Sequence, residues 1–183
     1  MKTIRPLYDK YGAEGFYRDH AADYSNPHFP EISALLQRNM SKFDCSGGVL
    51  DFACGGGEVT QVLQQSGIAK ITGCDPYTCD LYERQTKNTC LRLSFKDLIK
   101  GTSIGHYSLI ISSFALHLCP GKDLFPLTWR LFEAAPTLVV ITPHKRPELE
   151  KIPGIALAWE DCVTTEKGKR VKMKVYRRRE NLS

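Results

Sequence analysis

The pattern of apolar and polar positions divides the chain into alternating strands and helices. Short apolar runs bounded by glycine, aspartate or proline predict buried strands, and apolar residues spaced three and four positions apart predict helices. The predicted strands span residues 48–52, 69–74, 90–95, 107–113 and 137–142. The predicted helices between them span residues 58–65, 77–88 and 123–134. This alternation is typical of an α/β protein with a doubly wound, mostly parallel sheet.

Both ends of the chain depart from this alternation. Residues 155–164 and 171–178 form two extended segments around a glycine turn, which predicts a C-terminal antiparallel hairpin and brings the sheet to seven strands. Before residue 46, a helix over 12–24 and a second one opening at Pro30 predict an N-terminal helical extension. We therefore expect a single domain over 1–183, with 1–45 as an extension or lid and 46–183 as the core.

Composition and charge exclude several classes of protein. Hydrophobic residues make up 42% and charged residues 25% of the chain, which is ordinary for a globular domain. The longest apolar run, residues 109–118, is too short to cross a bilayer, and residues 1–6 lack the apolar part of a secretory signal. We expect a soluble, cytoplasmic protein without a membrane partner, although a nuclear location remains compatible with the sequence.

The seven cysteines suit an intracellular protein. Their number is odd, and no two are separated by two residues as in a C-x-x-C zinc motif. We expect reduced cysteines that pack as small buried hydrophobic residues, and no metal site.

A glycine turn lies between the first predicted strand and the first predicted helix. Gly55, Gly56 and Gly57 allow a ligand to approach the backbone, which is typical of a nucleotide-binding element. Thr60 stands where a dinucleotide site has its third glycine, and the lysine of a phosphate-binding loop is absent. Asp51, directly before the turn, would repel a pyrophosphate and suits a ligand that carries an amine or a sulfonium.

The segment Asp51-x-Ala53-x-Gly55-x-Gly57 resembles the E/D-x-G-x-G-x-G motif of class I S-adenosylmethionine (SAM) dependent methyltransferases, with Ala53 in place of the first glycine. The resemblance covers residues 45–178 and implies a Rossmann-like core, SAM as cofactor and methyl transfer as the reaction. The cofactor contacts that it implies are Asp51, Ala53, Gly55, Gly57, Asp75, Pro76, Asp97, Ser112 and Ser113.

Three of these contacts have a specific expected role. Asp75 corresponds to the acidic residue that binds the ribose hydroxyls, because a carboxylate accepts two hydroxyl donors well. Asp97 either accepts from the adenine amine or caps a short helix over 97–100. The segment that contains Ser112 and Ser113 is similar to the one beside the methyl donor.

The methyl acceptor is open between a small molecule, an RNA and a protein. His117, after the fourth strand, is the candidate catalytic residue, with a packed or solvent-facing histidine at a helix start as the alternative. The candidate substrate contacts lie on the N-terminal extension and in the loop after the fifth strand. They are Tyr17, His20, Tyr24, His144 and Lys145.

The net charge of +5 is concentrated near the C-terminus, where Arg177, Arg178 and Arg179 follow Tyr176. This basic hairpin predicts either RNA contact or an ordinary solvated face. A protein partner is also possible, because a scaffold with the SAM-binding fold that acts through a partner without catalysis is the alternative function. A nicotinamide dehydrogenase is disfavoured by Thr60 and by the hairpin.

Overall fold

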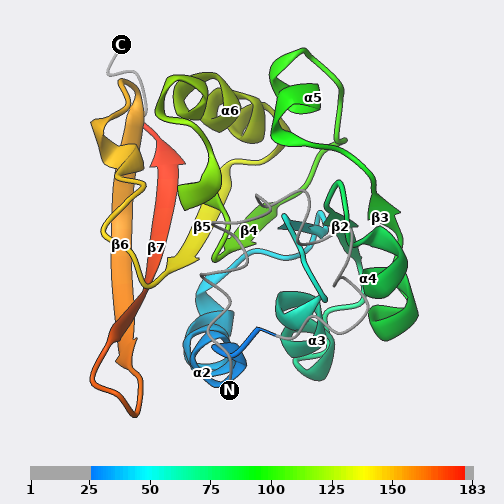
Figure 1. The fold of residues 1–183 in the computed structure, drawn as a ribbon, viewed down its shortest axis with the longest axis vertical. Helices are drawn as coiled ribbons and strands as arrows, with labels where there is room; N and C mark the ends of the chain where they lie inside the picture. Colours follow the sequence, from blue (N-terminus) through cyan, green and yellow to red (C-terminus); the bar gives the residue numbers. More distant parts are fainter. Residues whose placement is uncertain (1–25, 180–183) are drawn as a thin grey trace, which may run out of the picture.

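A seven-stranded sheet forms the centre of the protein (Figure 1), whose computed structural model describes residues 26–179. The strand order is β3-β2-β1-β4-β5-β7-β6. The first five strands are parallel, and β7 pairs antiparallel with both β5 and β6. The strands are β1 (Val49–Phe52), β2 (Ile71–Cys74), β3 (Cys90–Leu91), β4 (Leu109–Ser113), β5 (Thr137–Thr142), β6 (Ile155–Thr164) and β7 (Arg170–Arg178).

Five α-helices and three short 3-10 helices accompany these strands in the described part of the chain. The α-helices are α2 (Phe29–Asn39), α3 (Glu58–Gln65), α4 (Cys79–Thr86), α5 (Phe95–Ile99) and α6 (Gly121–Ala134). The 3-10 turns are η2 (Met40–Lys42), η3 (Leu116–Leu118) and η4 (Leu149–Lys151).

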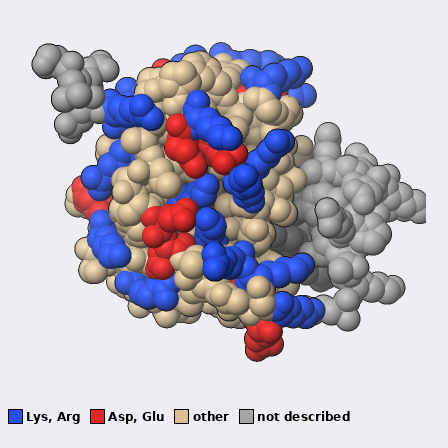
Figure 2. Space-filling view, turned by 90° about the vertical axis from the view of Figure 1, so that its left-hand side faces the viewer, with Lys and Arg blue, Asp and Glu red and all other residues tan. Residues whose placement is uncertain are grey.

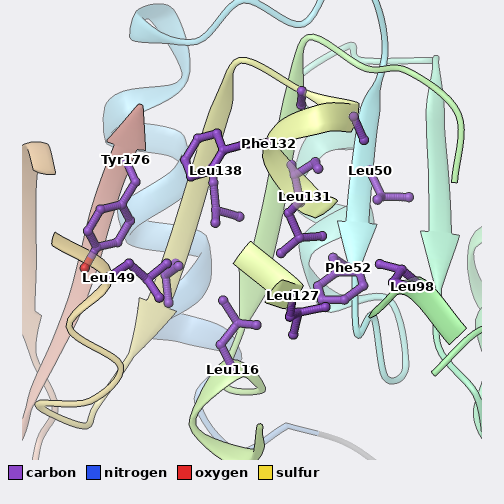
Figure 3. Close-up of a cluster of buried hydrophobic side chains, with 14 of the residues drawn as sticks. Leu50, Phe52, Leu98, Leu116, Leu127, Leu131, Phe132, Leu138, Leu149 and Tyr176 are labelled. Carbon is purple, nitrogen blue, oxygen red and sulfur yellow. The ribbon is translucent and has the colours of Figure 1, made fainter. Parts of the chain in front are cut away.

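Hydrophobic side chains pack on both faces of the sheet. On one face, Leu127 and Leu131 of α6 cover Leu50 and Phe52 of β1 (Figure 3). On the other face, α2 and α3 cover the neighbouring strand positions, of which Val49 is one. Figure 1 shows these two helical layers above and below the strands. Burial on both faces explains why the central strands are continuous apolar runs and not alternating ones.

The predicted elements agree with the structure except around the third strand. The helix over 58–65 matches α3 in full, whereas the helix predicted over 77–88 is shortened to α4. The strand predicted over 90–95 is wrong in its second half, because β3 ends at Leu91 and Phe95 begins α5. The Ser94 side chain accepts from the backbone N–H of Asp97 and caps this helix, which stops the strand.

The described part of the N-terminal extension is helical, as predicted. Pro30 lies in the first turn of α2, and Ile32, Leu35 and Leu36 are fully buried against the sheet. Arg38 pairs with Asp161 of β6 at 2.7 Å, which connects this helix to the edge of the sheet. The helix predicted over 12–24 lies outside the described residues.

The hairpin of β6 and β7 carries acidic as well as basic side chains. Lys172 pairs with Glu160 at 3.3 Å, and Lys174, almost completely buried, pairs with Glu150 at 3.5 Å. Figure 2 shows acidic groups set among the basic ones on this side of the molecule. Part of the positive charge predicted for a partner is therefore neutralised within the protein. Over residues 26–179, no helix is long and apolar enough to cross a membrane.

Candidate cofactor site

A cavity of about 410 Å³ opens where β1, β2 and β4 reach their carboxyl ends. This volume lies in the range of small-molecule sites, about 300–1,000 Å³. The carboxyl ends of parallel strands are also where ligands bind in doubly wound sheets. The residues that line the cavity are Asn26, Asp51, Ala53, Cys54, Gly55, Glu58, Val59, Asp75, Pro76, Tyr77, Ser94, Phe95, Lys96, Ser113, Phe114, Ala115, Leu118, Pro120 and Asp123.

The charged residues of this lining are mainly acidic. Asp51, Glu58, Asp75 and Asp123 contribute carboxyl groups, and Lys96 contributes the one lysine among the lining residues. An excess of carboxylates favours a cationic ligand and disfavours a pyrophosphate. The cavity thus suits an ammonium or sulfonium group better than the phosphates of a dinucleotide.

The glycine turn adopts the left-handed backbone that its sequence predicts. Gly55 has a φ of 54° and Gly57 a φ of 89°, and Gly57 precedes the first residue of α3. A Cβ atom at Gly57 would lie 2.5 Å from Cγ2 of Thr86, so both the backbone and the space require glycine. Gly57 packs against Thr86 and Tyr82 and is not among the cavity-lining residues.

Ala53 also has a positive φ, 55°, although it is not a glycine. This conformation is costly for a residue with a Cβ and is least so for the small ones. The resemblance noted above has glycine at this position, and the observed backbone gives the physical reason. Alanine keeps the turn at the cost of some strain, which is typical of functional sites.

Asp51 lies at the bottom of the cavity and is held by Thr60. The backbone N–H and the hydroxyl of Thr60 donate to Oδ2 of Asp51 at 3.1 and 2.7 Å. The Thr60 hydroxyl also contacts the Tyr82 hydroxyl at 2.8 Å. Burial raises the pKa of Asp51 well above its usual value, against the opposing effect of these hydrogen bonds. A cationic ligand in the cavity would favour the ionised form of this carboxyl group.

Asp75 connects the end of β2 to the glycine turn. Its Oδ2 accepts from the N–H of Gly55 at 3.3 Å, and its Oδ1 accepts from the N–H groups of Tyr77 and Thr78 at 2.9 and 3.1 Å. The carboxylate is thus fixed by three donors and still lines the cavity. Pro76, the next residue, lines it as well. This fixed position is consistent with the ribose-binding role expected from the sequence, which stays a prediction.

Asp97 does not line the cavity. Its Oδ2 accepts from both the N–H and the hydroxyl of Ser94, at 2.8 and 2.6 Å, and completes the cap of α5. The pKa of Asp97 is lowered by these same hydrogen bonds. Of the two roles left open for Asp97, the helix cap is the one that the geometry provides. The cavity wall is formed instead by Ser94, Phe95 and Lys96.

The two serines at the end of β4 face different surroundings. Ser113 lines the cavity, whereas Ser112 is fully buried and does not. Neither hydroxyl has a hydrogen-bond partner within the described part of the chain. A buried hydroxyl without a partner is costly, so the Ser113 hydroxyl is an available contact for a polar ligand group.

Phe114 follows these serines with a φ of 56°, which is rare for an aromatic residue. Its ring lines the cavity and stacks on His28, with centroids 4.8 Å apart. His28 precedes α2, so this contact connects the N-terminal side of the chain to the end of β4. Phe114 belongs to the segment that the resemblance places beside the methyl donor, whereas the sequence indicates no role for His28.

The candidate acceptor residues either do not line the cavity or lie outside the described range. The rings of His117 and His144 are 4.4 Å apart between centroids, and neither residue lines the cavity, nor does Lys145. Burial, and secondly the neighbouring His144, lowers the pKa of His117 to about 4, which leaves its ring neutral at pH 7. Tyr17, His20 and Tyr24 lie outside the described residues.

Sequence analysis missed two acidic contributors to the cavity. Glu58, the first residue of α3, accepts from the N–H of Asn26 at 2.8 Å, and burial raises its pKa. Asp123 lies in the first turn of α6. Both stand at helix starts that follow a strand end, which is the signal that would have indicated them. Within residues 26–179, no group of three or more His, Cys, Asp or Glu side chains is arranged to hold a metal ion.

The expectation of uniformly buried cysteines is wrong for three of the seven. All are free thiols, but Cys162 is exposed, and Cys45 and Cys90 are half-buried. Cys162 lies on the edge strand β6, where alternate side chains point to solvent.

Comparison with solved structures identifies the class of fold. The magnesium protoporphyrin IX methyltransferase of Synechocystis PCC 6803, solved with bound SAM, superimposes with a TM-score of 0.69 and 16% identity, over 98% of each chain. The N-methyltransferase NodS of Bradyrhizobium japonicum, in complex with S-adenosylhomocysteine (SAH), gives 0.68 and 12%, over 98% of this chain and 100% of NodS. The chain therefore has the Rossmann-like fold of class I SAM-dependent methyltransferases.

Comparison of the sequence with known proteins finds a relative whose function is not described. An uncharacterized protein of Schizosaccharomyces pombe is 29% identical over 184 aligned positions, which cover 76% of this chain and 74% of the relative. No protein-family model matches the chain.

Proposed function

We propose that this protein is a SAM-dependent methyltransferase. The observation that carries the proposal is the cavity with Asp51, Glu58 and Asp75 in its wall, placed at the strand ends of a fold whose neighbours were solved with SAM or SAH. The carboxylates suit the ammonium and sulfonium charges of SAM, and Asp75, which lines the cavity, would accept from the ribose hydroxyls. SAM would supply an electrophilic methyl group at this site.

The chain's own residues would contribute mainly by positioning and by excluding water. Methyl transfer from a sulfonium is an in-line displacement, and correct alignment of the reacting groups lowers its barrier by several kcal/mol. Ser113 and Phe114 lie where β4 ends and border the cavity, so we propose that they orient the acceptor against the methyl donor. His117, neutral at pH 7, is the proposed proton acceptor if the substrate must lose a proton.

The acceptor would meet an apolar rim. Leu118 and Tyr77 line the cavity and are 45% and 37% exposed, so they present hydrophobic surface at its mouth. We propose that the acceptor carries an apolar or aromatic part that packs on this rim. Following a labelled methyl group from SAM into small molecules, protein and RNA distinguishes the three classes of acceptor.

Calorimetric titration with SAM, SAH and NAD tests the cofactor. We expect SAM and SAH to bind and NAD not to bind. Asp75→Asn keeps an oxygen for the N–H groups of Tyr77 and Thr78, so it is the variant that preserves the turn and removes the charge. This variant should lower the affinity for SAM at least about tenfold. Binding of NAD without SAM would overturn the proposal.

RNA contact through the basic hairpin is a separate proposal. Lys167, Lys169 and Arg170 are exposed at the turn between β6 and β7, whereas Lys172 and Lys174 are paired with acids. Replacing the three exposed residues by glutamate should weaken binding of single-stranded RNA and reduce its salt dependence. An unchanged affinity would exclude the hairpin as the contact. A cytoplasmic location is likewise proposed, because seven free thiols suit a reducing compartment.

A further inference from the structure

Three thiols from separate segments come together at the cavity, which Cys54 lines and the other two residues do not. Cys54 belongs to the glycine turn, Cys79 begins α4 and Cys90 begins β3. The sulfur atoms of Cys54 and Cys90 lie 3.8 Å apart, and the Cys79 thiol donates to the carbonyl oxygen of Asp75 at 3.1 Å. We call these three residues the thiol cluster. The thiol cluster therefore lies next to the glycine turn and to the segment that follows β2, and both of these segments line the cavity.

The two facing thiols differ in the direction of their pKa shifts and in their access to solvent. Cys90 is half-buried, and the hydrogen bond from Cys54 is the main cause of its lowered pKa, with a smaller contribution from Cys79. Cys54 is 5% exposed, and burial raises its pKa well above the usual value. A partly accessible thiol with a lowered pKa, facing a buried thiol with a raised pKa, is the arrangement of a reacting and a resolving cysteine.

Metal binding does not account for the cluster. Its three thiols are not arranged as a metal site, since no such group occurs among residues 26–179. Packing alone does not require two facing thiols with a third one close by either, because any small apolar side chain would fill the same space. A reaction between two of the thiols would account for their proximity.

We propose that Cys54 and Cys90 are an oxidation site that forms a reversible disulfide, with hydrogen peroxide or another hydroperoxide as the oxidant. The Cys90 thiolate attacks one peroxide oxygen, the O–O bond breaks, and a sulfenic acid and hydroxide result. The Cys54 sulfur then attacks the Cys90 sulfur, the S–O bond breaks, and the Cys54 proton leaves with the hydroxide as water. In sum, two thiols lose two electrons and two protons, and hydrogen peroxide becomes two molecules of water.

The fold allows the two sulfurs to approach. A disulfide requires them to move from 3.8 Å to about 2.05 Å. The edge strand β3 is held by two residue pairs to β2, Gly73 with Cys90 and Cys74 with Leu91, so a small displacement breaks few contacts. On the other side, Cys54 precedes Gly55, whose N–H donates to Asp75.

The bond would therefore distort the cofactor cavity. Pulling Cys54 toward β3 moves a lining residue and disturbs the contact between Gly55 and Asp75. We expect the oxidised protein to bind SAH more weakly, and bound SAH to slow oxidation by covering Cys54. This consequence rests on the proposed function, whereas formation of the disulfide does not.

Peptide mapping of the full chain tests the bond itself. The reduced protein is treated with hydrogen peroxide, alkylated and digested with trypsin without reduction. Cleavage after Lys87 and Arg92 places Cys90 in a short peptide of its own, and fragmentation distinguishes Cys54 from Cys45, which shares its peptide. We expect a Cys54–Cys90 link that dithiothreitol reverses. No link, or a link of Cys90 to Cys79, would overturn the proposal.

SAH titration of the same samples tests the effect on the cavity. Oxidation should lower the affinity for SAH at least about tenfold, and dithiothreitol should restore this affinity. Cys90→Ser should bind SAH as the wild type does and should not respond to peroxide, whereas Cys162→Ser, at an exposed position, should respond as the wild type does. An oxidised wild type with unchanged affinity would overturn the effect on the cavity. If the reduced protein does not bind SAH, the proposed function fails, and the peptide map still decides the disulfide.

Discussion

Thr60 donates both its backbone N–H and its hydroxyl group to one carboxylate oxygen of Asp51, at 3.1 and 2.7 Å. Thr60 occupies the position where a dinucleotide-binding fold has its third glycine, and it is fully buried between α3 and the sheet. The same substitution that argues against a dinucleotide therefore fixes the acidic residue at the bottom of the cavity. The contact between Thr60 and Asp51 therefore both packs α3 against the sheet and holds a carboxyl group that faces the ligand.

Asp51→Asn should stabilise the unliganded protein and weaken its binding of SAM. The substitution removes a buried carboxyl group that costs free energy to ionise, and the amide oxygen still accepts from Thr60. We therefore expect the free energy of unfolding to be about 1–2 kcal/mol higher at pH 8. The folded-state pKa of Asp51 lies well above 3.8, so the wild type loses stability as the pH rises from about 3.8 toward that pKa. The difference should therefore vanish near pH 4 in urea unfolding experiments. A variant that is less stable yet binds SAM equally well would contradict this role of Asp51.

Gly57→Ala should be far more damaging than Gly56→Ala. A Cβ atom at Gly57 meets Thr86 at 2.5 Å on a backbone with φ of 89°, so we expect a loss of about 2–3 kcal/mol. At Gly56 the nearest atoms, 3.2–3.3 Å away, are the ends of the Gln85 and Glu58 side chains, so the loss should stay below about 1 kcal/mol. Urea midpoints of the two variants measure both losses. Equal losses would show that the left-handed turn is not required.

His144→Ala should raise the pKa of His117 from about 4 toward the usual 6.5, without reaching it because burial also lowers it. NMR titration of the His117 ring gives this value directly. In the wild type the unfolded chain binds this proton near pH 6.5 and the folded chain only near pH 4, so stability falls as the pH drops through that window. Part of the His117 side chain remains in contact with solvent, which screens the effect on the free energy of unfolding to less than about 1 kcal/mol. An unchanged pKa in the variant would contradict the coupling of the two rings.

Glu150→Ala and Glu160→Ala should differ in their effect on stability. Glu150 accepts from the Tyr176 hydroxyl at 2.9 Å and pairs with the buried Lys174, so its loss leaves a buried charge and should cost about 3 kcal/mol. Glu160 pairs with Lys172 on the surface, and its loss should cost at most about 0.5 kcal/mol. Thermal unfolding of both variants gives the comparison. A mild Glu150 variant would show that Lys174 reaches solvent.

The sequence predicts the order of strands and helices because each strand is an apolar run that ends in turn residues. It predicts the glycine turn and Asp75 for the same reason, since both follow strand ends directly. It fails at residues 90–95, where alternating Leu91 and Leu93 favour a strand but Ser94 and Asp97 form a helix cap. There a local hydrogen-bond pattern determines the structure against the hydrophobic period.

Features that depend on contacts distant in the chain could not be predicted. Cys54, Cys79 and Cys90 have no motif spacing, and only the packing of β3 beside β2 brings them together. Phe114 and His28 are likewise joined by the fold alone. The charge of Lys174 looked available for a partner, yet Glu150 of a separate turn neutralises it.

Transfer of a labelled methyl group from SAM tests the central claim most directly. The purified protein is incubated with methyl-labelled SAM and a cell extract, and the label is followed into RNA, protein and small molecules. We expect the wild type to label one of these classes and Asp75→Asn, folded by its thermal unfolding curve, to label it at a rate at least about tenfold lower. Binding of SAM without transfer to any class would contradict an enzyme and favour a scaffold that acts through a partner.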